Sequence, residues 1–401
     1  MPSTRTAEIA IIGGGIIGLA TTYALLRKYR DKSVILLEKE DRLAAHQSGH
    51  NSGVLHSGIY YKPGTLRAQN CLRGNRELVK FCQHYGIKHE ICGKVIVATT
   101  EAELPRLQSI YERGQTNGVP CERIDQAQLA KLEPHAQGVG AIHVPAAGIV
   151  DYPAVCEKLG QLIQAAGARV ILNARVEQIH STASEVELRT TAGDFTSKWL
   201  ITCGGLQSDR LARMDRHDPR AQIVPFRGEY FQLRPSANHL CRNLIYPVPD
   251  PRFPFLGVHF TRRIDGTVEC GPNAVLSWGR ENYSGKPDWG DLWETLCYTG
   301  FQKLAWKHWR MGWAEMRRSR NKALFLQALQ TLIPQVALDD LQPAPAGIRA
   351  QAVSPRGELI DDFVIEESTR GVHVLNAPSP AATASLAIGQ IVAERLSKKW
   401  W

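Results

Sequence analysis

Hydrophobic positions near the start of the chain follow first a strand pattern and then a helical one. A continuous apolar run over residues 9–12 is typical of a buried strand, and the spacing of Tyr23, Leu25 and Leu26 is typical of a helix. A second apolar run covers residues 34–37. This alternation predicts a strand, a helix and a second strand, as in the first unit of a parallel α/β sheet.

Three glycines lie where the first strand turns into the first helix. Gly13, Gly15 and Gly18 have the G-x-G-x-x-G spacing, which allows the turn, close approach of a pyrophosphate and tight helix–strand packing. The free N–H groups at the helix N-terminus would face that anion. Glu38 ends the second strand about 20 residues beyond Gly18, where a carboxylate accepts hydrogen bonds from a ribose. The pattern predicts a dinucleotide site made by Gly13, Gly15, Ile16, Ile17, Gly18, Glu38 and Lys39.

Periodicity predicts further elements along the rest of the chain. Helices are expected at 66–85, where Gly86 ends the pattern, at 104–110, at 152–166, in segments between 288 and 334, and after the small residues of 377–386. Strands are expected at 94–99, 170–172, 174–179, 200–202, 224–233, 243–247, 255–260, 266–270, 363–365 and 372–376. The four strands between 224 and 270 indicate an antiparallel sheet separate from the parallel one.

Composition and charge limit the class of protein. The 401 residues are 43% hydrophobic and 22% charged, which is typical of a soluble globular chain with room for two domains. No apolar run is long enough to span a membrane, and the fingerprint starts too early to leave room for a cleaved signal peptide. Nine scattered cysteines without C-x-x-C spacing indicate reduced thiols in the cytoplasm, with no metal site or disulfide implied. The net charge of +9 favours anionic substrates, lipid headgroups or nucleic acid as partners.

A loop rich in Ser, Gly, Asn and His follows the second strand. Its sequence over 46–61 is HQSGHNSGVLHSGIYY, and its small residues let the backbone lie close to a flat or phosphorylated ligand. Residues 48–61 resemble, nearly residue for residue, the loop of the L-2-hydroxyglutarate dehydrogenase/oxidase family, which are FAD enzymes of the D-amino-acid-oxidase type. The resemblance implies FAD as the cofactor, with further contacts from Ser48, Gly49, Asn51, Ser52 and Gly53.

The same resemblance implies the fold and more of the cofactor site. The expected fold is α/β, with a Rossmann-like FAD-binding domain over 1–90, 146–224 and 346–401, and an inserted antiparallel-sheet substrate domain carrying helices over 91–145 and 225–345. Val176 would lie against the adenine, and a second glycine turn at 203–205 would touch the flavin nucleotide. Small residues before the last helix would lie against the isoalloxazine. These contacts are Val176, Cys203, Gly204, Gly205, Ser379, Pro380, Ala381, Ala382 and Thr383.

A few side chains are candidates for binding and oxidising the substrate. In the resembled family, the position of Arg349 holds a substrate carboxylate, which a guanidinium binds with two parallel hydrogen bonds. Tyr60 or Arg227 would hold a second, distal carboxylate. His56 is the preferred base and His259 its rival, because imidazole titrates near working pH. Tyr246 is a further candidate contact, and for it, as for His259, a purely structural role stays open.

The resemblance implies an FAD-dependent oxidation of L-2-hydroxyglutarate to 2-oxoglutarate, with a membrane quinone or O2 taking the electrons. Alternatives with the same fold are an amine oxidase of the glycine or sarcosine type and a glycerol-3-phosphate dehydrogenase. A flavin-containing RNA-binding protein is the alternative outside enzymes, suggested by the basic charge alone, although no nucleic acid is expected as a partner.

The segment 288–334 combines tryptophans with cations at helical spacing. Trp306, Trp309, Trp313 and Met316 fall on one helix face beside a stripe of Lys and Arg, a pattern found in helices that lie at a membrane interface. The alternative is that the tryptophans pack on the substrate domain. The first interpretation predicts peripheral binding to an anionic membrane, at the cytoplasmic face of the inner membrane, with the C-terminal residues 398–401 as a second contact.

Overall fold

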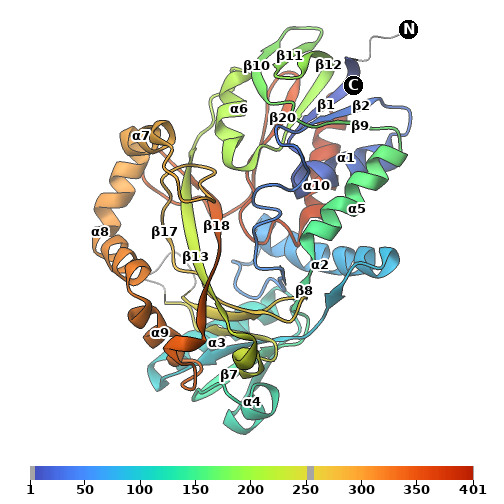
Figure 1. Ribbon diagram of the computed structural model, residues 1–401. Coiled ribbons are helices and arrows are strands. Elements are labelled where there is room, and N and C mark those ends of the chain that lie inside the picture. The colour runs from blue at the N-terminus through green and yellow to red at the C-terminus, as the bar shows by residue number, and fades with distance from the viewer. Residues whose placement is uncertain (1–4, 251–256, 401) are drawn as a thin grey trace.

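A computed structural model gives the structure of residues 5–250 and 257–400 (Figure 1). Its first sheet has the order β10-β11-β12-β1-β2-β9, with β20 beside β12 and β19 beside β20. The central pairs β1–β2, β1–β12, β2–β9 and β12–β20 are parallel. These strands are β1 (Thr6–Ile12), β2 (Val34–Leu37), β9 (Arg169–Ile171), β10 (Val176–Ser181), β11 (Val186–Thr190), β12 (Gly193–Thr202), β19 (Val364–Glu367) and β20 (Gly371–Asn376).

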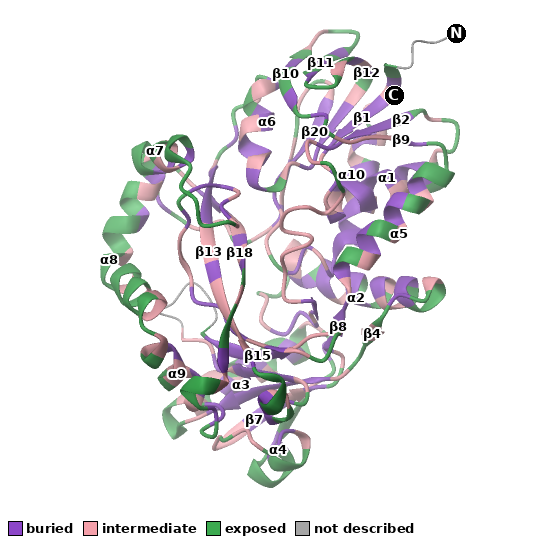
Figure 2. Cartoon of the chain, in the orientation of Figure 1, coloured by how far each residue is buried: buried purple, intermediate pink, exposed green. Residues whose placement is uncertain are grey.

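Helices cover the first sheet and are buried where they meet it. In Figure 2 the facing sides of α1 and α10 are largely buried; α1 also packs on α5, and α10 on α2. Alternate apolar residues of β1 and β2 belong to two core clusters. Ile9, Ile11, Val34 and Leu36 pack with these helices, and Ala10, Ile12, Ile35 and Leu37 pack with residues of β10, β11 and β12, as expected for parallel strands that are enclosed on both faces. The helices are α1 (Ile16–Lys28), α2 (Leu66–Tyr85), α5 (Tyr152–Ala165) and α10 (Ser385–Ser397).

The second sheet is mainly antiparallel and has the order β17-β13-β16-β15-β14-β5-β7-β6, with β18 paired to β13. Its strands are β5 (Lys94–Ala98), β6 (Glu122–Ile124), β7 (Gly140–Val144), β13 (Gln222–Leu233), β14 (Leu244–Pro247), β15 (His259–Arg262), β16 (Val268–Gly271), β17 (Val275–Leu276) and β18 (Leu341–Val353). A small third sheet contains β3 (Val54–Leu55), β8 (Gly148–Val150) and β4 (His89–Glu90).

Five more helices accompany the second sheet in the described residues. Figure 1 shows α7, α8 and α9 along the outer side of β13, β17 and β18, while α3 and α4 lie near β5 and β7. Their bounds are α3 (Leu104–Thr116), α4 (Gln126–Leu132), α7 (Trp289–Cys297), α8 (Thr299–Arg320) and α9 (Lys322–Gln330). No helix within the described ranges combines the length and the hydrophobicity needed to cross a bilayer.

Most predicted elements are present, and β18 is the main difference. The helix predicted at 66–85 is α2, and Gly86 ends it with φ 66°. The predicted strand 255–260 falls partly outside the described residues, and β15 begins at His259. The predicted return to the first domain at 346 falls within one strand, because residues 341–353 form β18, which is paired to β13; the boundary itself stays a prediction. The two prolines of β18 are tolerated because the strand lies at a sheet edge, where a missing N–H costs no ladder bond. The other domain boundaries stay predictions.

The tryptophans of α7 and α8 do not pack on the second sheet. Their side chains are 61–84% exposed, and Figure 2 shows the outer side of α8 as mostly exposed. We call this surface the tryptophan face; it consists of Trp289, Trp293, Trp306, Trp309 and Trp313. Two of the C-terminal residues that are predicted to form a second membrane contact make contacts within the protein. The ring of Trp400 packs on Tyr29 with centroids 4.5 Å apart, and Lys399 forms an ion pair with Glu367. Trp401 lies outside the described residues.

Candidate active site

A cavity of about 980 Å³ is lined by residues of both large sheets. It lies at the carboxyl ends of β1, β2 and β12, where open α/β sheets bind ligands. The loop 44–61, the chain after β12, the middle of β18 and the segment between β20 and α10 complete its wall. The predicted residues that line it are Gly13, Gly15, Ile16, Ile17, Glu38, Lys39, Ser48, Asn51, Ser52, His56, Tyr60, Val176, Cys203, Gly204, Gly205, Tyr246, His259, Arg349, Ser379, Pro380, Ala381 and Ala382.

The glycine turn between β1 and α1 is shaped for a phosphate. Gly13 has φ +109°, and a Cβ there would lie 2.4 Å from the carbonyl oxygen of Cys203. A Cβ on Gly18 would lie 1.9 Å from the carbonyl oxygen of Gly13, so Gly18 allows close packing and does not itself line the cavity. Gly15 is the N-cap of α1 without a side-chain cap, and the backbone N–H of Ile16 donates to Ser48 Oγ at 2.9 Å. The remaining N–H groups of this uncapped turn are available to an anion.

Glu38 is held rigidly at the same end of the cavity. Its carboxylate accepts hydrogen bonds from the backbone N–H groups of Gly14 at 2.6 Å and Glu40 at 2.9 Å. Because each carboxylate oxygen can accept a second bond, a ribose hydroxyl can still bind. Val176 lies at the start of β10 on the same wall. Turn, helix N-terminus and carboxylate therefore fit the adenosine diphosphate half of FAD.

Two predicted cofactor contacts in the following loop have a structural role instead. Gly49 and Gly53 do not line the cavity. A Cβ on Gly49 would lie 2.4 Å from the carbonyl oxygen of Ala44, and Gly53 has φ +71°. The amide of Asn51 donates to the carbonyl of Ser48 at 2.7 Å and accepts from the N–H of Gly53 at 2.9 Å, which fixes the turn. These glycines shape the loop that presents its neighbours to the cavity.

Thr383 also lies behind the cavity wall rather than on it. Its side chain is fully buried, and its hydroxyl lies 2.8 Å from the hydroxyl of Tyr152 and accepts from the backbone N–H of His56 at 3.1 Å. The carbonyl of His56 accepts from Asn75 at 3.0 Å. Thr383 and Asn75 thus hold the backbone of His56 from both sides, and the sequence pattern indicated neither contact.

Both candidate bases are neutral histidines. Burial lowers the pKa of His56 to about 3, and the positive charge of Lys94 is the next contribution. Burial likewise lowers the pKa of His259 to about 4. His259 Nδ1 lies 2.9 Å from the carbonyl of Gly257, so Nδ1 carries the proton and Nε2 is the free acceptor. The ring of His259 stacks on Tyr246 at 4.0 Å, and His56 Nε2 lies 3.3 Å from Ser379 Oγ.

Arg349 reaches the cavity from the middle of β18, opposite Phe226 of β13. It hydrogen-bonds Tyr230, whose pKa burial raises although the guanidinium charge opposes that shift. Tyr60 also lines the cavity, and its buried hydroxyl has no hydrogen-bond partner within the described residues. A cation and an unpartnered hydroxyl are suitable partners for a carboxylate ligand.

The structure does not bring Arg227 to the predicted substrate site. This residue does not line the cavity, and its guanidinium donates to the carbonyl of Asn282. Strand alternation explains this, because residues 227 and 230 of β13 point to opposite faces and Tyr230 points to the cavity. Sequence reasoning missed Tyr152, Tyr230 and Lys94; a lysine at the head of the apolar strand KVIVA was the only signal for the last.

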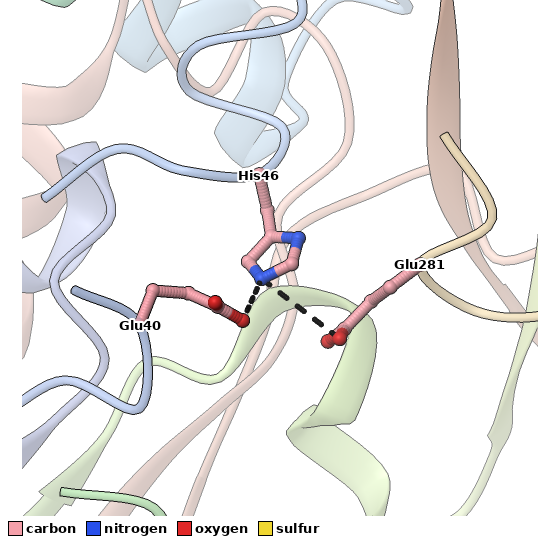
Figure 3. Close-up of side chains that lie close together, drawn as sticks. All are labelled: Glu40, His46 and Glu281. Carbon is pink, nitrogen blue, oxygen red and sulfur yellow. Dashed lines mark hydrogen bonds and ion pairs between the residues drawn. The ribbon is translucent and has the colours of Figure 1, made fainter. Parts of the chain in front are cut away.

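A polar cluster closes one side of the cavity (Figure 3). His46 Nε2 lies 2.8 Å from Glu40 and 3.8 Å from Glu281, and the three side chains have the spacing of metal ligands. Lys39 binds both carboxylates, at 2.9 Å to Glu40 and in a short contact to Glu281. Because the Lys39 ammonium binds both carboxylates, the cluster is described as an ion-pair network. It joins the loop after β2 to the segment between β17 and α7.

Comparisons with known proteins agree with this geometry. The family described as FAD dependent oxidoreductase matches residues 8–395. The L-2-hydroxyglutarate dehydrogenase of Indibacter alkaliphilus is 48% identical over 98% of this chain and 99% of its own length. The mitochondrial L-2-hydroxyglutarate dehydrogenase of Homo sapiens is 42% identical over 99% of this chain and 90% of its own.

Solved structures share the fold at low identity. The L-alpha-glycerophosphate oxidase of Mycoplasma pneumoniae with FAD bound has a TM-score of 0.79 at 22% identity, covering 99% of this chain and 96% of that one. The glycine oxidase of Geobacillus kaustophilus has a TM-score of 0.75 at 18% identity, with the same coverage. At this identity they support the predicted fold class and do not distinguish between substrates.

Proposed function

This chain belongs to the FAD-dependent oxidoreductases and, within them, to the L-2-hydroxyglutarate dehydrogenases, and from that premise we propose that it oxidises L-2-hydroxyglutarate to 2-oxoglutarate. The observation that carries the proposal is the placement of Arg349 and two neutral histidines in the cavity that holds the dinucleotide fingerprint. Full-length similarity to dehydrogenases of this substrate favours it over the amine, glycerol 3-phosphate and RNA-binding alternatives.

Each side chain has a role that its surroundings support. Arg349 binds the α-carboxylate and thereby orients the Cα–H bond. His56 accepts the hydroxyl proton, and His259 is the rival acceptor through its free Nε2. Substrate carboxylates near these rings would counter the surrounding cations and raise the low histidine pKa values toward the working range. Bound FAD supplies the acceptor for the hydride.

The test is anaerobic bleaching of the purified holoenzyme. L-2-hydroxyglutarate should remove the oxidised-flavin absorbance band, while the D enantiomer, sarcosine and glycerol 3-phosphate should leave it, because only the L-hydroxy acid presents its hydrogen to the flavin when Arg349 holds its carboxylate. Bleaching by sarcosine instead would indicate an amine oxidase, and bleaching by glycerol 3-phosphate would indicate a glycerol-3-phosphate dehydrogenase. Addition of a quinone analogue or of air afterwards identifies the electron acceptor.

We further propose that the enzyme works at an anionic membrane surface and passes its electrons to a quinone there, with O2 as the alternative acceptor. The tryptophan face supports this proposal, because aromatic side chains 61–84% exposed are costly in water and favourable at a headgroup boundary. Exposed cations alternate with them along α8, namely Lys303, Lys307, Arg310 and Arg317. Such residues are attracted to anionic lipid.

A further inference from the structure

Lys94 is a buried cation beside the substrate end of the cavity. It begins β5 and is 2% exposed, which makes it one of the largest fully buried side chains among the described residues. Its Nζ lies 4.6 Å from the ring centroid of Tyr60 and 4.9 Å from that of Tyr246. Both rings line the cavity, so only the thickness of these aromatic walls separates the charge from a bound ligand.

The surroundings of Lys94 disfavour a charged ammonium. No carboxylate within the described ranges forms an ion pair with Lys94. Cation–π attraction to two aromatic rings recovers only part of the hydration free energy that an ammonium loses on burial. A methionine would fill the same space without that cost. A stabilising role therefore does not explain the charge.

The groups around Lys94 leave its positive charge uncompensated. The rings of Tyr60 and Tyr246 face the ammonium, and its charge interacts with Cys71, His56 and His259. Burial raises the pKa of Cys71 to about 12, so its thiol is neutral. The charge of Lys94 helps to lower the pKa of both His56 and His259, which shows that its field reaches the reacting end of the cavity.

We propose that Lys94 is a specificity-determining residue, whose buried charge attracts the second carboxylate of a dicarboxylate through the walls formed by Tyr60 and Tyr246. The inference rests on the proposed function, in which Arg349 binds the first carboxylate. A monocarboxylate of equal length gains nothing from Lys94, so the residue selects for a dianion.

The direct test compares two unreactive ligands of equal length on the holoenzyme. Glutarate carries two carboxylates and pentanoate one, and each is titrated while the flavin absorbance shift is followed. Lys94→Met should raise the dissociation constant of glutarate by roughly tenfold or more, since a charge pair across a partly buried wall contributes about that much. The constant for pentanoate should change less than about twofold. The ratio of kcat/KM between L-2-hydroxyglutarate and L-2-hydroxypentanoate should fall in parallel.

A pH series distinguishes the effect of the Lys94 charge on glutarate binding from the effect of its side-chain shape. Burial lowers the pKa of Lys94 to about 8, so the charged form is present below that pH and is lost above it. Wild-type affinity for glutarate should therefore weaken as pH rises through about 8, while affinity for pentanoate does not follow. Lys94→Arg keeps its charge across this range and should remove the alkaline loss.

Controls keep the inference separate from the function on which it rests. Lys131→Met, an exposed change on α4, should leave both ligand affinities at wild-type values. Lys94→Met should keep FAD and melt no lower than wild type, because an unpaired buried charge is removed. Equal weakening of glutarate and pentanoate, or unchanged glutarate binding, would overturn the role of Lys94. A wild-type holoenzyme that binds glutarate but is not bleached by L-2-hydroxyglutarate would overturn the proposed function instead.

Discussion

Arg349, the predicted partner of the α-carboxylate, lies in a strand that the sequence analysis did not predict. It lies within β18, in the strand that crosses the predicted domain boundary at 346, and it reaches the cavity beside Tyr230. The predicted chemistry is unchanged, because a planar guanidinium on a strand still presents two parallel N–H groups to a carboxylate. The strand adds rigidity, since its pairing with β13 fixes where the side chain begins.

Replacement of Arg349 by lysine should lower kcat/KM for L-2-hydroxyglutarate by about 100-fold, because an ammonium replaces a bidentate grip by a single point contact. FAD should remain bound at the wild-type ratio, since Arg349 lies away from the glycine turn. Steady-state kinetics and the flavin spectrum measure the two effects. Arg356→Lys, in the exposed turn after β18, is the matched control; wild-type kinetics in Arg349→Lys would remove Arg349 from the substrate site.

At the scale of elements, α1 and α10 cross in close contact. A Cβ on Gly389 of α10 would lie 2.6 Å from the backbone carbonyl of Ala20 in α1, so the helices approach backbone to backbone. The contact holds α1, and with it the glycine turn at its N-terminus, against the C-terminal helix. The phosphate end of the cavity therefore depends on packing between two helices that lie far apart in the sequence.

Gly389→Ala should lower the free energy of unfolding by about 1–3 kcal/mol, because the added methyl group forces the two helices apart. Chemical denaturation of the holoenzyme measures this. Gly312 of α8 offers the opposite control: a Cβ there meets nothing within 4 Å, so Gly312→Ala should raise stability by about 0.4–1 kcal/mol. If Gly389→Ala and Gly312→Ala change the free energy of unfolding in the same direction, steric contact between α1 and α10 does not explain the effect of Gly389→Ala.

At the scale of the whole molecule, the two large sheets supply different halves of the site. The first sheet carries the dinucleotide fingerprint, and the second carries Arg349, His259, Tyr246 and Lys94. The buried ion pair between Arg280 and Asp209 and the network of Figure 3 tie segments of the two halves together. The helix α8, which carries Trp306, Trp309 and Trp313, lies along the outer side of β13 and β18 in Figure 1, so docking there leaves the cofactor half free.

If that face docks on lipid, the protein should co-sediment with vesicles containing anionic phospholipid at low salt and be released at high salt, because screening weakens the attraction of its cations. Combined replacement of Trp306, Trp309 and Trp313 by alanine should reduce binding severalfold, while Trp199→Phe on β12 should bind as wild type. Absence of wild-type binding at low salt would refute the membrane proposal and leave the oxidation untouched.

The sequence by itself determined the parallel α/β start, the glycine fingerprint with Glu38, and His56 as a candidate base, because these depend on local spacing and residue chemistry. Arg349 became a candidate through the resemblance to the L-2-hydroxyglutarate dehydrogenase/oxidase family. It could not decide which side of β13 Arg227 faces, that β18 continues past two prolines, or that Gly49, Gly53 and Thr383 support the wall instead of forming it. Those outcomes depend on strand pairing and on contacts between residues distant in the chain. Only the tertiary structure, by bringing β5, β14 and the loop 44–61 together, placed the charge of Lys94 beside two tyrosine rings that line the cavity.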